Sequence, residues 1–295
     1  MTIDYRRKEA HLKSDQNTRG QPTDGNEEDR LREIARRLRR EVLTMTTEAG
    51  SGHPSSSLSP VEIMTELYFG GILRYDPKNP HWPGRDRFIL SKGHAAPILY
   101  AVLAEAGYFP TDWLHTLRKL GSPLEGHPNM RRVPGVEAST GSLGQGLSIG
   151  LGHALNARLD GLDYTVYVLM GDGEIQEGQV WEAAMAAANF KTGNLVGIVD
   201  NNGYQQSSAV SDVTDPALYP KKWRAFGWET VEIDGHDLGQ VRDALLEAKW
   251  YTKGPFAIIA HTVKGKGVSF LEQSYTWHGR AVPPEQLPKA LEEIG

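Results

Sequence analysis

The stretch Tyr164-Thr165-Val166-Tyr167-Val168-Leu169-Met170-Gly171-Asp172-Gly173-Glu174 decides the fold of this 295-residue chain. Its first seven residues carry no charge and are rich in Val and Tyr, which predicts a strand buried on both faces. The glycines that flank Asp172 predict a tight turn at the carboxyl end of this strand, and a helical stretch follows over 178–190. A buried strand that turns directly into a helix is the repeating unit of a parallel sheet.

More units of this kind lie on both sides of the first. Buried strands are predicted over 195–199, 230–233 and 256–260, and helices over 61–69, 97–106, 145–159, 216–226 and 237–251. This alternation predicts an α/β fold: a doubly wound, mostly parallel sheet with helices on both faces. In such sheets ligands bind beyond the carboxyl ends of the strands, so the search for a site begins there.

Composition restricts both the domain organisation and the class of function. Residues 1–27 are polar and almost free of aliphatic side chains, which predicts a flexible arm before a single domain over 28–295. The chain has no cysteine, which excludes disulfides, zinc–thiolate sites and cysteine nucleophiles. Its net charge of −5 argues against a nucleic-acid partner. Neither a membrane-spanning run nor a signal-peptide core is present, so we expect a cytoplasmic protein without a membrane partner.

Two strand ends carry hard oxygen ligands. Asp172 follows the strand over 164–170, and Asn202 and Tyr204 follow the next strand about thirty residues later. A carboxylate, an amide oxygen and a turn carbonyl suit Mg²⁺ or Ca²⁺, with the phosphates of a ligand completing the coordination shell. Gly-Asp-Gly and Asn-Gly are also common turn formers. Their matching positions at two neighbouring strand ends nevertheless favour a site.

Histidines and a glycine-rich loop mark further candidates. His53, His94 and His127 each follow a glycine directly, a setting that suits proton transfer or hydrogen bonding to hydroxyls and phosphates. The loop over 140–146 reads Thr-Gly-Ser-Leu-Gly-Gln-Gly. It lacks the strong preceding strand of a dinucleotide site, so it predicts a close backbone approach to a ring or phosphate instead. His278, in Trp-His-Gly, is a candidate to close over a phosphate.

Taken together, these motifs resemble the transketolase family of thiamine-diphosphate enzymes. The resemblance rests on the order and spacing of Ser51–Pro54, Arg85–His94, Glu125–Pro128, Ser139–Gly146, Gly171–Gly173, Asn201–Gly203 and Asp234–Asp237. It covers roughly Glu28 to the C-terminus and implies the thiamine-diphosphate-binding fold, in its pyrophosphate-type domain. The pyrophosphate-binding half of the family ends near the end of this chain. The resemblance therefore implies the N-terminal subunit of a split transketolase.

The resemblance also implies a role for each matching residue. The metal would be bound by the side chains of Asp172 and Asn202 and by the carbonyl of Tyr204, where the family often has Ile. The contacts to thiamine diphosphate would come from His94, Gly173 and His278 at the diphosphate and from Gly141, Leu143 and Gly144 at the rings. The family usually has Pro where Ser142 stands, which puts the rigidity of this loop in question.

The remaining roles concern catalysis and assembly. Glu177 would reach across a subunit interface toward the partner's catalytic Glu, beside the cofactor. His53 and His127 would face the sugar hydroxyls, so the implied catalytic residues are His53, His127, Glu177 and His278. The implied reaction transfers a two-carbon ketol unit from a ketose phosphate to an aldose phosphate in the pentose phosphate pathway, with Mg²⁺ or Ca²⁺.

The pyrimidine-binding half of the site has no counterpart in this sequence, where no second sheet domain is evident. We therefore expect the isolated chain to be inactive and to work in an α₂β₂ assembly with a C-terminal transketolase subunit. Other functions stay open at this point. A relative acting on a sulfo-sugar or branched sugar, or an acyloin-forming synthase, would use the same half-site. A non-catalytic α/β protein that binds a phosphorylated ligand would need neither metal nor partner.

Overall fold

The computed structural model describes residues 25–295. The arm predicted over 1–27 lies outside the described residues, except for its last three. Those three already belong to the long helix α2 (Gly25–Ala49), which therefore begins before Glu28. Its apolar residues, such as Leu31 and Leu38, recur at helical spacing and are buried against the rest of the domain.

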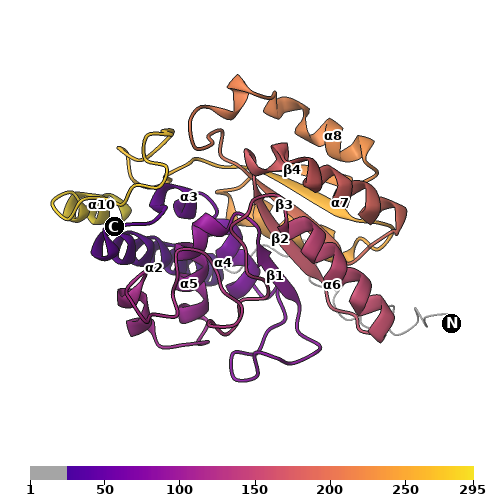
Figure 1. The fold of residues 1–295 in the computed structure, drawn as a ribbon, viewed down its shortest axis with the longest axis horizontal. Coiled ribbons are helices and arrows are strands. Elements are labelled where there is room, and N and C mark those ends of the chain that lie inside the picture. Colours follow the sequence, from indigo (N-terminus) through magenta and orange to yellow (C-terminus); the bar gives the residue numbers. More distant parts are fainter. Residues whose placement is uncertain (1–24) are drawn as a thin grey trace.

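The central element is a five-stranded sheet in the order β1-β2-β3-β5-β4, in which all four pairings are parallel (Figure 1). The strands predicted from the sequence correspond to β2 (Val166–Gly171), β3 (Leu195–Asn201), β4 (Glu229–Asp234) and β5 (Phe256–His261). The parallel sheet is thus confirmed. The prediction that the strand over 230–233 is buried is wrong, because β4 is an edge strand on which Glu232 is exposed. The edge strand β1 (Arg87–Leu90) was not predicted, because it is only four residues long and starts with a charge.

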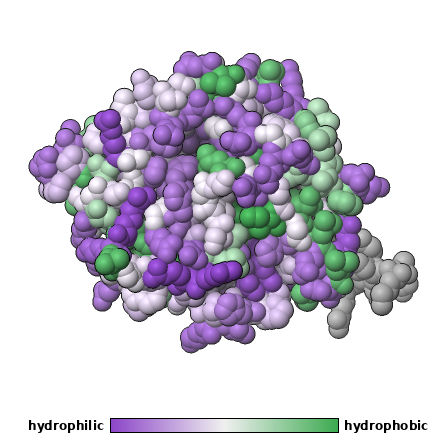
Figure 2. Space-filling view, viewed as in Figure 1, coloured by the Kyte–Doolittle hydropathy of each residue, from purple (hydrophilic) through white to green (hydrophobic). Residues whose placement is uncertain are grey.

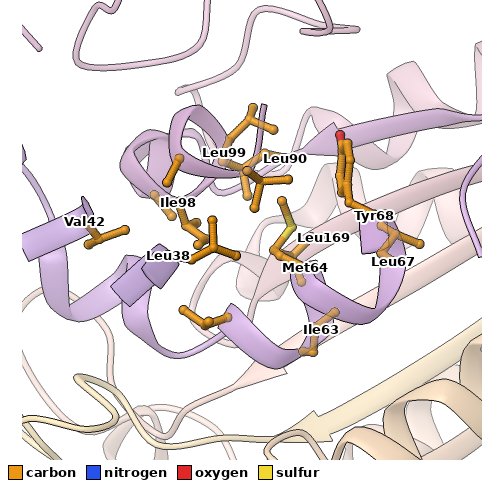
Figure 3. Packing of buried hydrophobic residues seen from close by; sticks show 14 of the residues in the cluster. Leu38, Val42, Ile63, Met64, Leu67, Tyr68, Leu90, Ile98, Leu99 and Leu169 are labelled. Carbon is orange, nitrogen blue, oxygen red and sulfur yellow. The ribbon is translucent and has the colours of Figure 1, made fainter. Parts of the chain in front are cut away.

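Helices cover both faces of the sheet, as predicted. One face carries α6 (Gly146–Asp160), α7 (Gly178–Asn189) and α8 (Tyr219–Ala225). The other carries α2, α4 (Val61–Phe69), α5 (Ala96–Glu105) and α9 (Leu238–Trp250). Along β2 the side chains alternate between the two layers: Tyr167 and Leu169 face the second, Val166 and Val168 the first. Figure 3 shows Leu169 and Leu90 among residues of α2, α4 and α5.

Short elements complete the fold around this core. They are α3 (Pro54–Leu58), α10 (Leu287–Ile294) and the 3-10 turns η2 (Gly93–Ala95), η3 (Thr111–Thr116), η4 (Glu174–Gln176), η5 (Val210–Asp212) and η6 (Pro216–Leu218). The helix predicted over 216–226 is divided into η6 and α8. Asp215 caps η6 by accepting from the N–H of Ala217 at 3.0 Å, and Pro220 lies in the first turn of α8.

The topology predicts a ligand-binding crevice at the carboxyl ends of the strands. From β1 to β3 the chain advances across the sheet, then crosses to the far edge as β4 and returns as β5 beside β3. This reversal next to β3 is where open parallel sheets bind ligands. Among the described residues, no helix is both long and apolar enough to cross a membrane. Figure 2 shows a mostly hydrophilic face on which apolar atoms gather toward the right, in the region of α6 and α7.

Candidate active site

Asp172 lies just beyond β2, buried to 1% exposure. Its carboxylate accepts the N–H of Gly173 at 2.9 Å and the N–H of Gly203 at 2.6 Å. The second bond joins the turn after β2 to the turn after β3, so the two strand ends are connected as the sequence spacing predicted. Burial, together with the nearby carboxylate of Asp200, raises the pKa of Asp172 to about 7. A site that disfavours its own negative charge in this way suits a divalent cation.

The turn after β3 carries the other two predicted metal ligands. Asn202 is buried, and its side-chain oxygen accepts the N–H of Tyr204 at 3.1 Å, while its side-chain nitrogen donates to Asp200 at 3.1 Å. Tyr204 is half-buried and pairs with Ala209 in an isolated antiparallel bridge. Because a backbone carbonyl serves as the predicted ligand at position 204, the Tyr side chain does not alter the donor type.

Asp200 and Lys92 form a buried ion pair directly beneath these ligands. The side chain of Asp200 also accepts hydrogen bonds from Ser59 at 2.6 Å and from Thr262. Burial would raise the pKa of this carboxyl, but Lys92 and the hydroxyls hold it below its ordinary value. Sequence reasoning missed this pair. The lysine stands inside the Ser-Lys-Gly-His motif, and only its complete burial shows that it contributes to the site.

Three histidines from separate segments form a cluster at the carboxyl ends of the strands. The ring centroids of His53, His94 and His278 lie 5.1–5.2 Å apart. Burial, with cations nearby, lowers the pKa of His53 to about 4 and that of His278 to about 3, and it lowers the pKa of His94 well below its usual range. The rings are therefore neutral at pH 7. The Nδ1 atom of His53 is buried and has no hydrogen-bond partner in the part of the chain that the structure describes.

Lys264, which sequence reasoning also missed, completes the cluster. Its ammonium donates to the hydroxyl of Ser56 at 3.0 Å and lies 3.2 Å from Nδ1 of His278. Burial and the neighbouring Lys92 lower its pKa to about 8. A lysine buried among neutral imidazoles, with few anions to balance it, forms an environment that favours an anionic ligand.

The glycine-rich loop over 140–146 is held against β1 and β2 by the buried carboxylate of Glu174. This carboxylate accepts the N–H of Gly144 at 3.0 Å, the N–H of Gly171 at 2.9 Å and the hydroxyl of Ser91. Gly141 adopts a φ of +147°, and a Cβ there would lie 2.9 Å from the ring of His127. The loop thus packs its backbone closely against its neighbours, as the glycine pattern predicts.

The rim of the site is formed by exposed side chains. His127, Leu143 and Glu177 are all exposed, and the carboxylate of Glu177 has no partner within residues 25–295. Gly144 and Glu177 lie side by side, since a Cβ on Gly144 would be 2.6 Å from Cβ of Glu177. Asp172 and Asn202 are therefore buried at the carboxyl ends of the strands, and His53, His94 and His278 are half-buried, whereas His127, Leu143 and Glu177 are exposed.

The donors fit a hard cation next to an anionic group. No cluster of three or more His, Cys, Asp or Glu side chains suited to a metal occurs within 25–295. The predicted set has one carboxylate, one amide and one carbonyl, so a complete shell requires oxygens from a ligand. The orphaned nitrogen of His53 and the buried Lys264 lie on the side where such an anion would be held.

The chain is similar to known proteins in both sequence and structure. The sequence pattern of the family described as "Transketolase, thiamine diphosphate binding domain" matches residues 31–295. The chain is 45% identical over 268 residues to the transketolase of Pongo abelii, covering 90% of this chain and 42% of that protein. It therefore spans about two fifths of the length of such relatives. The structure superposes on transketolase from Campylobacter jejuni with a TM-score of 0.84 and 35% identity, covering 90% of this chain and 42% of that one.

Shorter relatives are matched over nearly their whole length. The 6-deoxy-6-sulfo-D-fructose transketolase subunit of Clostridium sp. (strain MSTE9) is 41% identical, with 90% of this chain and 96% of the relative covered. One subunit of the apulose-4-phosphate transketolase of Actinobacillus succinogenes is 43% identical, with the same two shares covered.

Proposed function

The chain belongs to the transketolase family, and from this premise we propose that it is the pyrophosphate-binding subunit of a two-subunit transketolase. It transfers a two-carbon ketol unit between sugar phosphates when a second subunit is present. The observation that carries the proposal is the meeting of Asp172, the Asn202 turn and the histidine cluster at one sheet edge. Ordinary turns and surface histidines would not be expected to converge in this way.

The need for a second subunit is supported by what the described chain lacks. Residues 25–295 form a single sheet, and no second sheet domain is present there to enclose an aminopyrimidine ring. Relatives named as transketolase subunits are matched over 96% of their length, whereas the longer transketolases are matched over 42%. We propose an α₂β₂ assembly in which Glu177 and Leu143, both exposed at the rim, face the partner. Exposed apolar side chains on α7 and just after it, Met185 and Phe190, provide further contact area.

The cofactor would be held at the interior of the crevice. Asp172, Asn202 and the carbonyl of Tyr204 would bind Mg²⁺, or Ca²⁺ in its place, and His94, His278, Gly173 and Lys264 would contact the diphosphate. Gly141, Leu143 and Gly144 would line the rings. When bound, thiamine diphosphate supplies a nucleophilic carbon and an electron sink for cleavage of a ketose C–C bond. The buried Asp172 and Lys264 would orient its charged end and keep water away from it.

The side chains at the mouth of the crevice would handle the protons. The pKa of His127 is lowered by partial desolvation of its ring and by Arg118, and the pKa of His53 is lowered to about 4. Both rings are therefore neutral near pH 7 and can accept a proton from a sugar hydroxyl at a ring nitrogen, then return it when the new C–C bond forms. His278, 5.2 Å from His53 between ring centroids, is placed to share this role.

We propose sugar phosphates of cytoplasmic pentose phosphate metabolism as substrates. A second candidate is a modified sugar, because the names of two closely similar subunits specify a sulfo-fructose and apulose 4-phosphate. We propose that the residues named above would contact only the reacting end of the ketose and would therefore not distinguish these sugars. Selection among donors would then be made largely by the missing subunit.

The test is a reconstitution assay. The chain is recovered from its native extract with thiamine diphosphate and Mg²⁺ present, and a stoichiometric partner is identified by mass spectrometry. Ketol transfer is then measured for the chain alone, the partner alone and the pair, with xylulose 5-phosphate, sulfo-fructose and apulose 4-phosphate as donors. Activity of the pair only is the expected result. Full ketol transfer by this chain alone would refute the proposed dependence on a second subunit.

A further inference from the structure

We infer that Asp200 is a positioning residue whose buried carboxylate fixes which end of the Asn202 amide faces the cation site. The inference rests on the proposed function, because it concerns the cation placed at this edge. Asp200 is not among the predicted ligands, and it is fully buried at the end of β3, two residues before Asn202. Its effect on the cation would therefore be exerted through another side chain.

Four donors from separate parts of the chain converge on this one carboxylate. Ser59, just before α4, donates to Oδ2 at 2.6 Å, and Lys92, after β1, donates to the same oxygen. Thr262, after β5, donates to Oδ1. The fourth donor is the side-chain nitrogen of Asn202, at 3.1 Å from Oδ2. Asp200 thus links the ends of β1, β3 and β5 to the segment between α3 and α4.

The bond to Asn202 decides the orientation of its amide group. An amide side chain presents an oxygen on one side and an NH₂ on the other, and only the oxygen can bind a cation. Because the nitrogen donates to the ionised Asp200, the oxygen is turned toward the residue 204 turn, where it accepts the N–H of Tyr204 at 3.1 Å. An amide oxygen has a second lone pair, so this orientation leaves an acceptor for the cation.

Stability alone is a weak reason for a buried Lys–Asp pair, since apolar side chains of similar volume often serve as well. The chain offers a second buried aspartate with a cationic partner for comparison, at the amino ends of the strands. Asp86 is buried to 2% exposure before β1 and accepts from the backbone N–H of Arg74 at 2.9 Å, its guanidinium at 3.0 Å and the N–H of Thr165 at 2.8 Å. Asp86 has the same chemistry without a link to the crevice.

The first experiment follows the Asn202 amide in the cofactor-free full chain. The chain is labelled with ¹⁵N at asparagine, and the Asn202 side-chain resonance is identified by its absence in Asn202→Asp. Hydrogen exchange of this NH₂ is compared in the wild type, Asp200→Asn and Asp86→Asn. We expect exchange to accelerate about tenfold in Asp200→Asn, as the loss of a charge-assisted hydrogen bond requires, and to stay within twofold of the wild type in Asp86→Asn.

The second experiment measures Mg²⁺ affinity at saturating thiamine diphosphate in the complex of the chain with its partner subunit. Loss of an outer residue that orients a ligand typically weakens metal binding by about 10–100-fold. We expect a loss of this size in Asp200→Asn and a change below twofold in Asp86→Asn, although both variants lower the melting temperature. A purely structural role would move the melting temperature of both variants and the Mg²⁺ affinity of neither.

Asp200→Asn leaves Lys92 buried without its partner, which can unfold the chain. The double variant Lys92→Met/Asp200→Leu replaces the pair by apolar side chains and gives the same two readouts in that case. Unchanged Asn202 exchange in both variants, or equal acceleration in Asp86→Asn, would overturn the inference. So would an Mg²⁺ affinity within twofold of the wild type. A wild-type complex that binds no Mg²⁺ refutes the proposed function instead, and the exchange experiment still decides the role of Asp200.

Discussion

The two ends of the parallel sheet use charged residues in different ways. At the amino ends of the strands, Asp86 is satisfied by Arg74 and Thr165, and Arg85 pairs with Glu137 at 2.6 Å. At the carboxyl ends, Asp172 is buried and no cation from residues 25–295 contacts it directly, and His53 keeps a nitrogen unpaired within the same range. We call the amino ends of the strands the complete edge, because the charged groups named there are paired within the chain. We call the carboxyl ends the incomplete edge, because the groups named there are paired only when a ligand binds. Stability is therefore concentrated at one edge and binding at the other.

The largest effect should follow from removing the carboxylate of the incomplete edge. Asp172→Asn in the reconstituted enzyme is expected to lower kcat/KM by on the order of 10³-fold, since a bound metal contributes several kcal/mol to such sites. The increase in melting temperature that Mg²⁺ and thiamine diphosphate give the wild type should also disappear. The control is Asp163→Asn, an exposed carboxylate at the other edge, and an equal loss there would contradict the comparison.

The complete edge should respond in stability instead. Arg74→Met leaves Asp86 buried without its cation, and breaking such a pair costs about 3–5 kcal/mol. Chemical denaturation of the full chain should show this loss, while kcat per folded enzyme stays within twofold of the wild type. Arg32→Met, which removes only the exposed pair with Glu28, should cost less than about 1 kcal/mol. If kcat falls in parallel with stability, the two edges are not separable.

The histidine cluster should give the incomplete edge a characteristic pH dependence. The pKa of His278 is lowered from 6.5 to about 3 by burial and by Lys264. As pH falls below 6.5, His278 therefore binds a proton in the unfolded chain but not in the folded chain. The free energy of unfolding declines as a result until about pH 3. The decline is at most about 1.4 kcal/mol per pH unit for this histidine.

The measurement is the difference in unfolding free energy between the wild type and His278→Gln from pH 7 to 4. Burial raises the pKa of Glu66 to about 7, so this carboxyl makes the free energy of unfolding rise as pH falls. Its contribution cancels in the difference, because Glu66 is present in both proteins. The wild type should lose stability relative to the variant as pH falls. His81→Gln, at an exposed position outside the cluster, controls for the removal of a histidine side chain. Parallel curves for the wild type and His278→Gln would show that the ring is solvated.

The smallest effect is expected at Tyr204. Its predicted contribution is a backbone carbonyl, so Tyr204→Ile should keep Mg²⁺ affinity and kcat within about twofold of the wild type. The side chain is only half-buried, and little packing is lost. Titration of the reconstituted enzyme with Mg²⁺ measures this directly. A tenfold loss would mean that the ring itself contributes to the incomplete edge.

Sequence patterns predicted the sheet because β2, β3 and β5 are built on continuous apolar runs and β4 alternates Val and Ile with polar residues. They missed β1, whose four residues begin with Arg87. The site was predicted where polar residues lie in glycine-flanked turns at strand ends, as at Asp172 and the Asn202 turn. Lys92, Asp200 and Lys264 escaped prediction because a charged residue in a sequence gives no sign that it is buried. Their pairing depends on contacts between segments more than 100 residues apart, such as Lys92 and Asp200.

The Glu174 carboxylate has a consequence for how this protein can change over generations. Its hydrogen bonds to Ser91, Gly144 and Gly171 tie two positions distant in the sequence, and one three residues away, to a single side chain. Positions 91 and 174 should therefore vary together among descendants, while Ser142, exposed in the same loop, drifts independently. Anyone altering this loop by mutagenesis and selection would diversify 142 and keep 91, 144 and 174 constant.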